Sequence, residues 1–286
     1  MTYFTLLKRL ESQLLGVCGQ EALSEASYLL REVFCLGKVG LLSLYHETID
    51  DKTSILQVDR LVQRRLKGEP LAYVLGHQEF CGRRYGCPQG VLIPRPETEV
   101  FVEVISEYLR SREVTGLCLL ECGAGTGCIS IELALRFPGI QVMSWDINPL
   151  AIKTARENAK YLGATGVTFV HGNFFDVDFS AGDVSEIICD KDVVLLSNPP
   201  YVSEDEWQEV SASIRSYEPK EAFLSGQLGL DHLLPLIDLS IKFSWPSFFE
   251  IGFKHANMLR TRLDLDVDLC FFKDLEGIER VLRLGI

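Results

Sequence analysis

The stretch LCLLECGAGTG, residues 117–127, decides the fold. Its first five residues form a short, mostly apolar run of the length of a buried strand, and Gly123, Gly125 and Gly127 follow in a tight turn. The next residues, CISIELALRF (128–137), carry apolar side chains at helical spacing. A strand, a glycine-rich turn and a helix in this order predict one unit of an α/β sheet, and glycine lets the backbone approach a ligand closely.

The same alternation of strand and helix continues towards the end of the chain. The runs IQVMSWD, VTFVHG, DVVLLS and SFFEIG predict strands, and two more extended pieces close the chain. Helical spacing recurs in residues 97–111, 148–163 and 228–243. The pattern therefore predicts a mainly parallel, doubly wound sheet of seven strands, with the Rossmann-like arrangement of strands and helices.

The N-terminal part of the chain has a different character. Three segments within residues 1–75 have apolar residues at helical spacing, which predicts a small helical bundle domain. Residues 76–96 alternate Gly, Pro and aromatic residues with short extended pieces, and Pro94 and Pro96 exclude a helix there. The predicted organisation is a helical domain (1–75), a β-hairpin or linker (76–96) and an α/β domain (97–286).

Polar and aromatic residues follow the second and third predicted strands. Asp146 lies 23 residues after Gly123, where a carboxylate binds ribose hydroxyls in Rossmann-like folds. Asn173 and Phe174 follow the next strand, and an amide beside an aromatic face suits an adenine. The alternatives are a tight turn without a ligand, a polar loop and a core aromatic residue. No G-x-x-x-x-G-K-[ST] motif is present, so the pattern predicts a nucleoside pocket without a phosphate-binding loop.

The fourth predicted strand runs directly into Asn198, Pro199, Pro200 and Tyr201. The two prolines fix the backbone and remove two N–H donors, so the corner presents acceptors: the Asn198 side-chain oxygen and a backbone carbonyl. Two acceptors at a fixed separation can hold both hydrogens of an –NH₂ group, and Tyr201 offers a flat face to a planar amide or base. A conjugated –NH₂ is a poor nucleophile, so it needs a strong electrophile held in line, such as a sulfonium methyl group. A strand-terminating proline turn is the alternative.

These motifs together resemble those of S-adenosylmethionine-dependent amino-group methyltransferases. The flanking segments GEPLAYVLGHQEF (68–80), VLIPRPETE (91–99), YEPKEAFLSGQLGLD (217–231) and DLEGIERV (274–281) resemble the bacterial release factor glutamine methyltransferase family. The resemblance implies methyl transfer from S-adenosylmethionine to the side-chain amide nitrogen of the glutamine in the Gly-Gly-Gln motif of class-1 peptide chain release factors. It also implies that the N-terminal helical domain recognises this protein substrate.

The resemblance also implies which residues form the site. It implies cofactor contacts at Gly123, Ala124, Gly125, Thr126, Gly127, Asp146, Phe174 and Asn198. It implies that the catalytic and substrate-binding corner consists of Asn198, Pro199, Pro200 and Tyr201, with Asn198 and the Pro199 carbonyl holding the amide. The resemblance also places the IPRPETE segment near the active site, which makes Arg95, Pro96, Glu97 and Thr98 further site candidates. Arg95 is a substrate-binding candidate, and a structural salt bridge is its alternative. The chain departs from the usual family pattern at Glu121, Phe174 and His255, where Asp, Trp and Gln are common.

Charge and composition bound the possible partners. The chain has 286 residues, 47% of them hydrophobic, and a net charge of −12. Residues 1–85 carry 11 Lys and Arg against 10 Asp and Glu, whereas the remainder carries 17 against 30. An acidic surface argues against direct nucleic acid binding and tolerates a basic protein or a cationic ligand. The alternatives are a DNA adenine methyltransferase, a ribosomal-protein glutamine methyltransferase, a Rossmann oxidoreductase and a non-catalytic binding module.

The sequence offers no sign of export or of a metal site. No apolar run approaches the length of a membrane span, and the N-terminus lacks the layout of a signal peptide, so a cytoplasmic protein is expected. Nine scattered cysteines predict free thiols in a reducing compartment. Cys118, Cys122 and Cys128 contain no C-x-x-C pair and have no histidine nearby, so no metal is expected.

Overall fold

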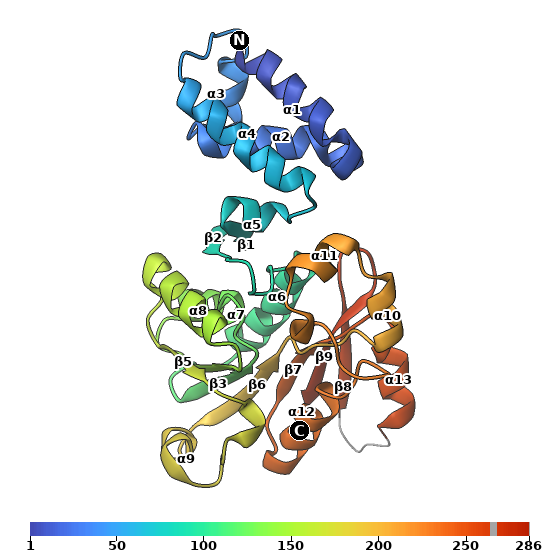
Figure 1. The fold of residues 1–286 in the computed structure, drawn as a ribbon. Helices are drawn as coiled ribbons and strands as arrows, with labels where there is room; N and C mark the ends of the chain where they lie inside the picture. Colours follow the sequence, from blue (N-terminus) through green and yellow to red (C-terminus); the bar gives the residue numbers. More distant parts are fainter. Residues whose placement is uncertain (264–267, 286) are drawn as a thin grey trace. The chain divides into compact units, whose positions relative to one another are not determined.

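The computed structural model describes residues 1–263 and 268–285. The chain divides into two compact units, whose helices and strands are labelled in Figure 1. One comprises Met1–His77 together with Ser211–Tyr217, and the other comprises Gln78–Val210 together with Glu218–Ile286. A segment from the second half of the sequence therefore belongs to the N-terminal unit, which no pattern in its own residues predicts.

The first unit is a bundle of short helices, which confirms the helical bundle predicted from the sequence. Its helices are α1 (Tyr3–Cys18), η1 (Gly19–Glu21), α2 (Ala22–Val33), α3 (Lys38–Ser43), α4 (Lys52–Leu66), α5 (Leu71–Leu75) and α11 (Ala212–Tyr217). Leu6, Leu7, Leu10 and Leu14 are all buried, so one face of α1 forms the centre of the bundle core. A buried face of this kind stabilises each short helix more than its intrinsic propensity does.

Helix α11 is attached to the end of α4 by side-chain hydrogen bonds. The Ser213 hydroxyl donates to the Gly68 carbonyl at 2.6 Å, and the Tyr217 hydroxyl donates to the Lys67 carbonyl at 3.1 Å. The last carbonyl groups of a helix and those just beyond it have no partner within the helix, so such donors satisfy them. This is why the distant segment belongs to the N-terminal unit.

The second unit contains a seven-stranded sheet with the order β5-β4-β3-β6-β7-β9-β8. Its strands are β3 (Leu117–Cys122), β4 (Gln141–Asp146), β5 (Val167–His171), β6 (Asp192–Ser197), β7 (Ser247–Glu250), β8 (Asp268–Lys273) and β9 (Glu279–Gly285). The first five are parallel, and β9 pairs antiparallel with both β7 and β8. The predicted α/β class and number of strands are confirmed.

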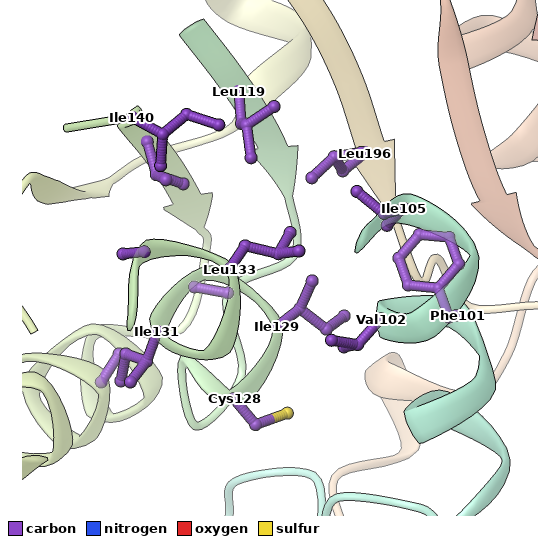
Figure 2. Close-up of a cluster of buried hydrophobic side chains, with 14 of the residues drawn as sticks. Phe101, Val102, Ile105, Leu119, Cys128, Ile129, Ile131, Leu133, Ile140 and Leu196 are labelled. Carbon is purple, nitrogen blue, oxygen red and sulfur yellow. The ribbon is translucent and has the colours of Figure 1, made fainter. Parts of the chain in front are cut away.

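Helices cover both faces of this sheet. The unit contains α6 (Glu97–Arg110), α7 (Cys128–Arg136), α8 (Pro149–Leu162), α9 (Gly182–Ile188), α10 (Glu204–Glu209), α12 (Leu233–Phe243) and α13 (His255–Arg262). Alternate residues of β3 enter different cores: Leu119 packs with α6, α7 and α8, and Leu120 packs with α12 and α13. Figure 2 shows the first core, where Ile105 of α6 lies beside Leu196 of β6.

Two connecting segments also bear on the site. The predicted hairpin is present as β1 (His77–Phe80) and β2 (Arg83–Gly86), which form a two-stranded sheet. Helix α12 begins at Leu233, five residues later than the helical pattern predicts. Gly229 has a φ of +73°, a left-handed conformation that interrupts the helix, so the preceding residues are free to line a cavity.

No helix in the described residues is long and apolar enough to cross a bilayer.

Candidate active site

A cavity of about 500 Å³ lies where the parallel strands β3, β4, β5 and β6 reach their carboxyl ends. Carboxyl ends of parallel strands share one edge of a sheet, which is why residues far apart in sequence meet there. The volume is within the range of small-molecule sites. Of the residues predicted from the sequence, the lining includes Gly123, Gly125, Asp146, Phe174, Asn198 and Pro200.

The glycine-rich turn gives the cavity its shape without offering an anion-binding nest. Gly123 N–H and Ala124 N–H donate to the Trp145 carbonyl at 2.8 and 2.9 Å, and Gly125 N–H donates to Asp146 at 2.8 Å. These N–H groups are therefore directed back to β4 rather than into the cavity. Phosphate-binding loops direct such groups at the ligand, so this turn fits a ligand without phosphates at that point.

The third glycine of the turn is required for packing. Gly127 has a φ of +80°, and a Cβ atom there would lie 2.9 Å from Ile131 Cδ1, 3.0 Å from Ala155 Cβ and 3.1 Å from Phe169 Cζ. The neighbouring side chains of Ala124 and Thr126 are buried and are not part of the lining. Only the first and second glycines thus border the cavity, and the predicted cofactor contacts of Ala124, Thr126 and Gly127 stay predictions.

Asp146 closes the end of β4 and holds the turn. Its Oδ2 accepts from Gly125 N–H and its Oδ1 accepts from Asn148 N–H, both at 2.8 Å. Burial raises the pKa of Asp146, while the two backbone donors and nearby His171 act in the opposite direction. Each carboxylate oxygen can accept more than one hydrogen bond, so Asp146 can also accept from a ligand hydroxyl.

Two aromatic side chains follow β5. One is mainly a core residue and the other is exposed at the cavity, a distinction that the sequence pattern does not make. Phe174 is only 2% exposed and packs edge-to-face on Trp145 at 5.3 Å, so it is mainly a core residue that touches the cavity. Phe175 is 42% exposed and also lines the cavity, as does Ile147, which is 61% exposed. Sequence reasoning missed both exposed residues. The doubled Phe in HGNFF was the available signal, because adjacent side chains point in different directions.

The asparagine that follows β6 is fixed by α6. Asn198 Nδ2 donates to Thr98 Oγ1 at 3.2 Å, and no donor among the described residues reaches Asn198 Oδ1. The amide nitrogen is therefore engaged and the amide oxygen retains its acceptor capacity. Asn198 and Pro200 line the cavity, whereas Pro199 is buried and outside the lining.

Tyr201 lies behind this corner. Its hydroxyl donates to Glu250 Oε1 at 3.4 Å, and burial raises the pKa of Tyr201, which keeps the hydroxyl protonated. Its backbone is approached closely by Gly229, where a Cβ atom would lie 2.3 Å from the Tyr201 carbonyl oxygen. His255 packs against the Tyr201 ring at 6.5 Å. The catalytic roles predicted for Pro199, Pro200 and Tyr201 stay predictions.

Arg95 is engaged in a nearly buried ion pair. Its Nη2 lies 2.6 Å from Glu218 Oε1, and Glu218 Oε2 accepts from Ile93 N–H at 3.2 Å. The Glu218 side chain is 1% exposed and the Arg95 side chain 27%. The guanidinium group also lies over the Phe223 ring, and Arg95 is outside the cavity lining. The pair joins the IPRPETE and YEPKEAF segments, and substrate binding by Arg95 stays a prediction.

The charged side chains that line the cavity are all acidic. Asp146, Glu221 and Asp231 contribute carboxylates, and no Lys or Arg belongs to the described lining. His232 also lines the cavity, and burial lowers its pKa, which favours the neutral imidazole. In the described part of the chain, no three His, Cys, Asp or Glu side chains are grouped so that they could hold a metal ion. The cavity is therefore suited to a ligand with positive charge.

Two family models match the chain. The model of the PrmC N-terminal domain matches residues 5–76, and the model of a methyltransferase domain matches residues 114–215. These matches cover the helical unit and most of the parallel strands, so they agree with the two kinds of structure described above.

Crystal structures of methyltransferases share the fold. The hMettl16 catalytic domain in complex with MAT2A 3'UTR hairpin 6 superposes with a TM-score of 0.54 at 13% identity, covering 82% of each chain. The N-terminal domain of human METTL16 in complex with SAH gives a TM-score of 0.51 at 14% identity, covering 91% of this chain and 93% of that one. At such identities the likeness concerns the fold.

Curated relatives carry one common name, release factor glutamine methyltransferase. The protein of Enterococcus faecalis is 33% identical over 273 residues, which are 91% of this chain and 93% of the relative. That of Geobacter sulfurreducens is 33% identical over 93% of this chain and 91% of the relative. That of Neisseria gonorrhoeae is 38% identical over 72% and 70%. With this identity along nearly its whole length, the chain belongs to the release factor glutamine methyltransferase family.

Proposed function

We propose that this protein transfers a methyl group from S-adenosylmethionine to the side-chain amide nitrogen of the glutamine in the Gly-Gly-Gln motif of class-1 peptide chain release factors. The observation that carries the proposal is the arrangement of Asn198. Its Nδ2 is bound to Thr98, so its oxygen is the free acceptor at a cavity wall. An acceptor at this position can hold an –NH₂ group.

The cavity fits S-adenosylmethionine on three grounds. Its volume of about 500 Å³ suits a nucleoside, its turn directs the N–H groups away from the cavity, and its charged side chains are acidic. When bound, S-adenosylmethionine supplies an electrophilic methyl group on a positively charged sulfonium. Asp146 would bind the ribose hydroxyls, and Phe175 and Ile147 would cover the adenine.

The chain's own residues would prepare the substrate nitrogen. An amide nitrogen shares its lone pair with its carbonyl, so it reacts only when it is held close to the electrophile and in line with it. The Asn198 oxygen and the Pro199 carbonyl would each accept one hydrogen of the –NH₂ group. These hydrogen bonds strengthen as positive charge develops on nitrogen, which lowers the barrier. The methylated nitrogen then loses one of its two hydrogens as a proton to solvent water, which gives the neutral N-methyl amide. Pro199 and Pro200 would keep both acceptors at a fixed separation.

The direct test uses the full-length protein, methyl-labelled S-adenosylmethionine and a purified class-1 release factor. We expect one added methyl group per factor, which peptide mass mapping assigns to the glutamine of Gly-Gly-Gln. A ribosomal protein and an adenine-containing DNA duplex serve as competing substrates in the same assay. Labelling of either one instead of the release factor, or of a different residue of the factor, would overturn the proposal.

Removal of the Asp146 carboxylate is expected to weaken cofactor binding. Asp146→Ala leaves ribose hydroxyls without acceptors and frees Gly125 N–H, so Kd should rise by an amount equivalent to about 1–3 kcal/mol, or roughly 5- to 150-fold. Isothermal titration calorimetry with S-adenosylmethionine measures this change. Asp178→Ala is the matched control, because Asp178 is outside the lining. An unchanged Kd for Asp146→Ala would contradict the assignment.

We also propose that the helical unit recognises the release factor. The cavity lining consists only of residues from the second unit, and the helical unit matches a separate family model. The protein should therefore discriminate between an intact release factor and a short peptide that contains Gly-Gly-Gln. We expect KM to be at least tenfold lower for the intact factor with the same enzyme. Equal KM values would show that recognition requires nothing beyond the motif.

A further inference from the structure

A buried pair of side chains lies directly behind the Asn198 corner. Thr98, the second residue of α6, is 2% exposed, and Glu250, the last residue of β7, is 1% exposed. Neither belongs to the cavity lining. Thr98 Oγ1 accepts from Asn198 Nδ2, and Glu250 Oε1 accepts from the Tyr201 hydroxyl. Both ends of the Asn-Pro-Pro-Tyr segment are thus held by this pair.

Two groups of the pair have unused hydrogen-bonding capacity. The Thr98 oxygen already accepts from Asn198, so its proton must be given to another acceptor, and the described residues contain no well-aligned hydrogen bond from it. Glu250 Oε2 is fully buried and likewise has no well-aligned partner there. Thr98 nevertheless lies close enough to the carboxyl group to lower its pKa. The Thr98 proton and the Glu250 oxygen are therefore a donor and an acceptor that can satisfy each other.

The direction of these hydrogen bonds determines which atom of Asn198 is available to a substrate. While Glu250 is ionised, it can only accept, so the Thr98 hydroxyl can donate to it while its lone pairs accept from Asn198 Nδ2. A protonated Glu250 can instead donate to Thr98 and compete with Asn198. The hydroxyl could then donate to the Asn198 oxygen, which would turn the amide and remove the free acceptor.

We propose that Thr98 and Glu250 form a positioning relay that keeps the Asn198 amide oxygen towards the cavity and anchors Tyr201. This inference rests on the proposed function, because it assigns the relay to the acceptor that holds the substrate –NH₂ group. Thr98 and Glu250 act through Asn198 and touch neither substrate nor cofactor. The relay couples α6 and β7 to the strand end of β6.

The charged neighbours of Glu250 set the pH range in which the relay works. The pKa of Glu250 is raised to about 7, chiefly by burial and to a smaller extent by Glu97, against the opposite effect of Thr98, Arg280 and Tyr201. Arg280 is ion-paired with Asp274 at 3.0 Å. His255, which packs on Tyr201, has a pKa lowered by burial and stays neutral in this range. The ionised carboxylate is present above the pKa, so kcat should fall as pH decreases through about 7.

Paired substitutions at Thr98 test the relay. Thr98→Val keeps the shape and removes the hydroxyl, and we expect kcat to fall at least tenfold while the Kd of S-adenosylmethionine changes less than twofold. Thr98→Ser restores the hydroxyl and should recover kcat to within about threefold of the original protein. Ser106→Ala is the matched control, because Ser106 is a buried hydroxyl residue of the same helix that donates to Val102. A kcat for Thr98→Val within twofold of the original would overturn the proposal.

A second measurement does not depend on catalysis. In the original protein one of the two Asn198 side-chain –NH₂ hydrogens is bound to Thr98 Oγ1 and should exchange slowly by NMR, and in Thr98→Val this hydrogen should exchange at least tenfold faster. Glu250→Gln should abolish the decrease in kcat below pH 7, and the persistence of that decrease would contradict the role of Glu250. If the original protein fails to methylate a release factor, the proposed function fails. If it methylates normally and Asn198 exchange is equal in both proteins, only the relay fails.

Discussion

Asn198→Ala is expected to reduce the rate of methyl transfer about 100-fold, the loss that follows removal of one group that stabilises developing charge in a transition state. The substitution removes the acceptor oxygen at the cavity wall and leaves the backbone of the corner intact, since Pro199 and Pro200 still restrict it. The Kd of S-adenosylmethionine should change by less than threefold. Single-turnover kinetics with saturating cofactor and release factor measures the transfer step.

The chain provides a matched control for this variant. Asn173 also lines the cavity, but its oxygen caps Phe175 N–H at 3.1 Å. We expect Asn173→Ala to weaken cofactor binding and to leave the single-turnover rate at saturation within threefold. A normal transfer rate for Asn198→Ala, or equal effects of both variants on that rate, would contradict the role of Asn198.

Arg95→Ala is expected to destabilise the second unit by about 3 kcal/mol, as loss of one partner of a buried ion pair does. The reason is that Glu218, with a side chain only 1% exposed, would lose its positive partner. Urea unfolding followed by tryptophan fluorescence measures the change in free energy. Trp145, Trp207 and Trp245 are the only tryptophans and all belong to the second unit, so the signal reports on that unit.

Two further variants separate a structural role of Arg95 from a role in substrate binding. Arg110→Ala removes the partner of an exposed pair, at 3.7 Å from Glu103, and should change the free energy of unfolding by about 0.5 kcal/mol or less. The double variant Arg95→Ala/Glu218→Gln removes the unpaired charge and should recover most of the stability. Full activity of the double variant would assign Arg95 to the ion pair alone, whereas a stable but inactive double variant would assign it to the substrate.

The strand ends could be read from the sequence because parallel topology brings them to one edge. Once β3, β4 and β6 were recognised, Gly123, Asp146 and Asn198 had to be neighbours, and the cavity lining confirms that they are. The same reasoning could not decide between Phe174 and Phe175. Which of two adjacent rings enters the core depends on packing against Trp145, a contact that no local pattern contains.

Contacts between distant segments were the least predictable part. In the sequence, the segments that contain Arg95 and Glu218 are separate motifs. Only the fold reveals that these two side chains, 123 positions apart in the sequence, form a hydrogen bond. Glu250 belongs to the predicted strand SFFEIG, but its burial near Thr98 and Tyr201 follows only from the order of the strands in the sheet. The resemblance makes Thr98 a site candidate, but side chains that support a site without lining it have no periodicity or spacing that predicts which residues they contact.

The membership of Ser211–Tyr217 in the N-terminal unit has an evolutionary consequence. The helical unit is not one continuous segment, because part of it lies in the sequence between the Asn-Pro-Pro-Tyr motif and the Glu218 segment. A recombination event that replaced only residues 1–77 would leave α11 packed against a foreign partner. Exchange of the helical unit between lineages therefore requires compensating changes at two places in the sequence, which favours gradual co-variation over domain shuffling.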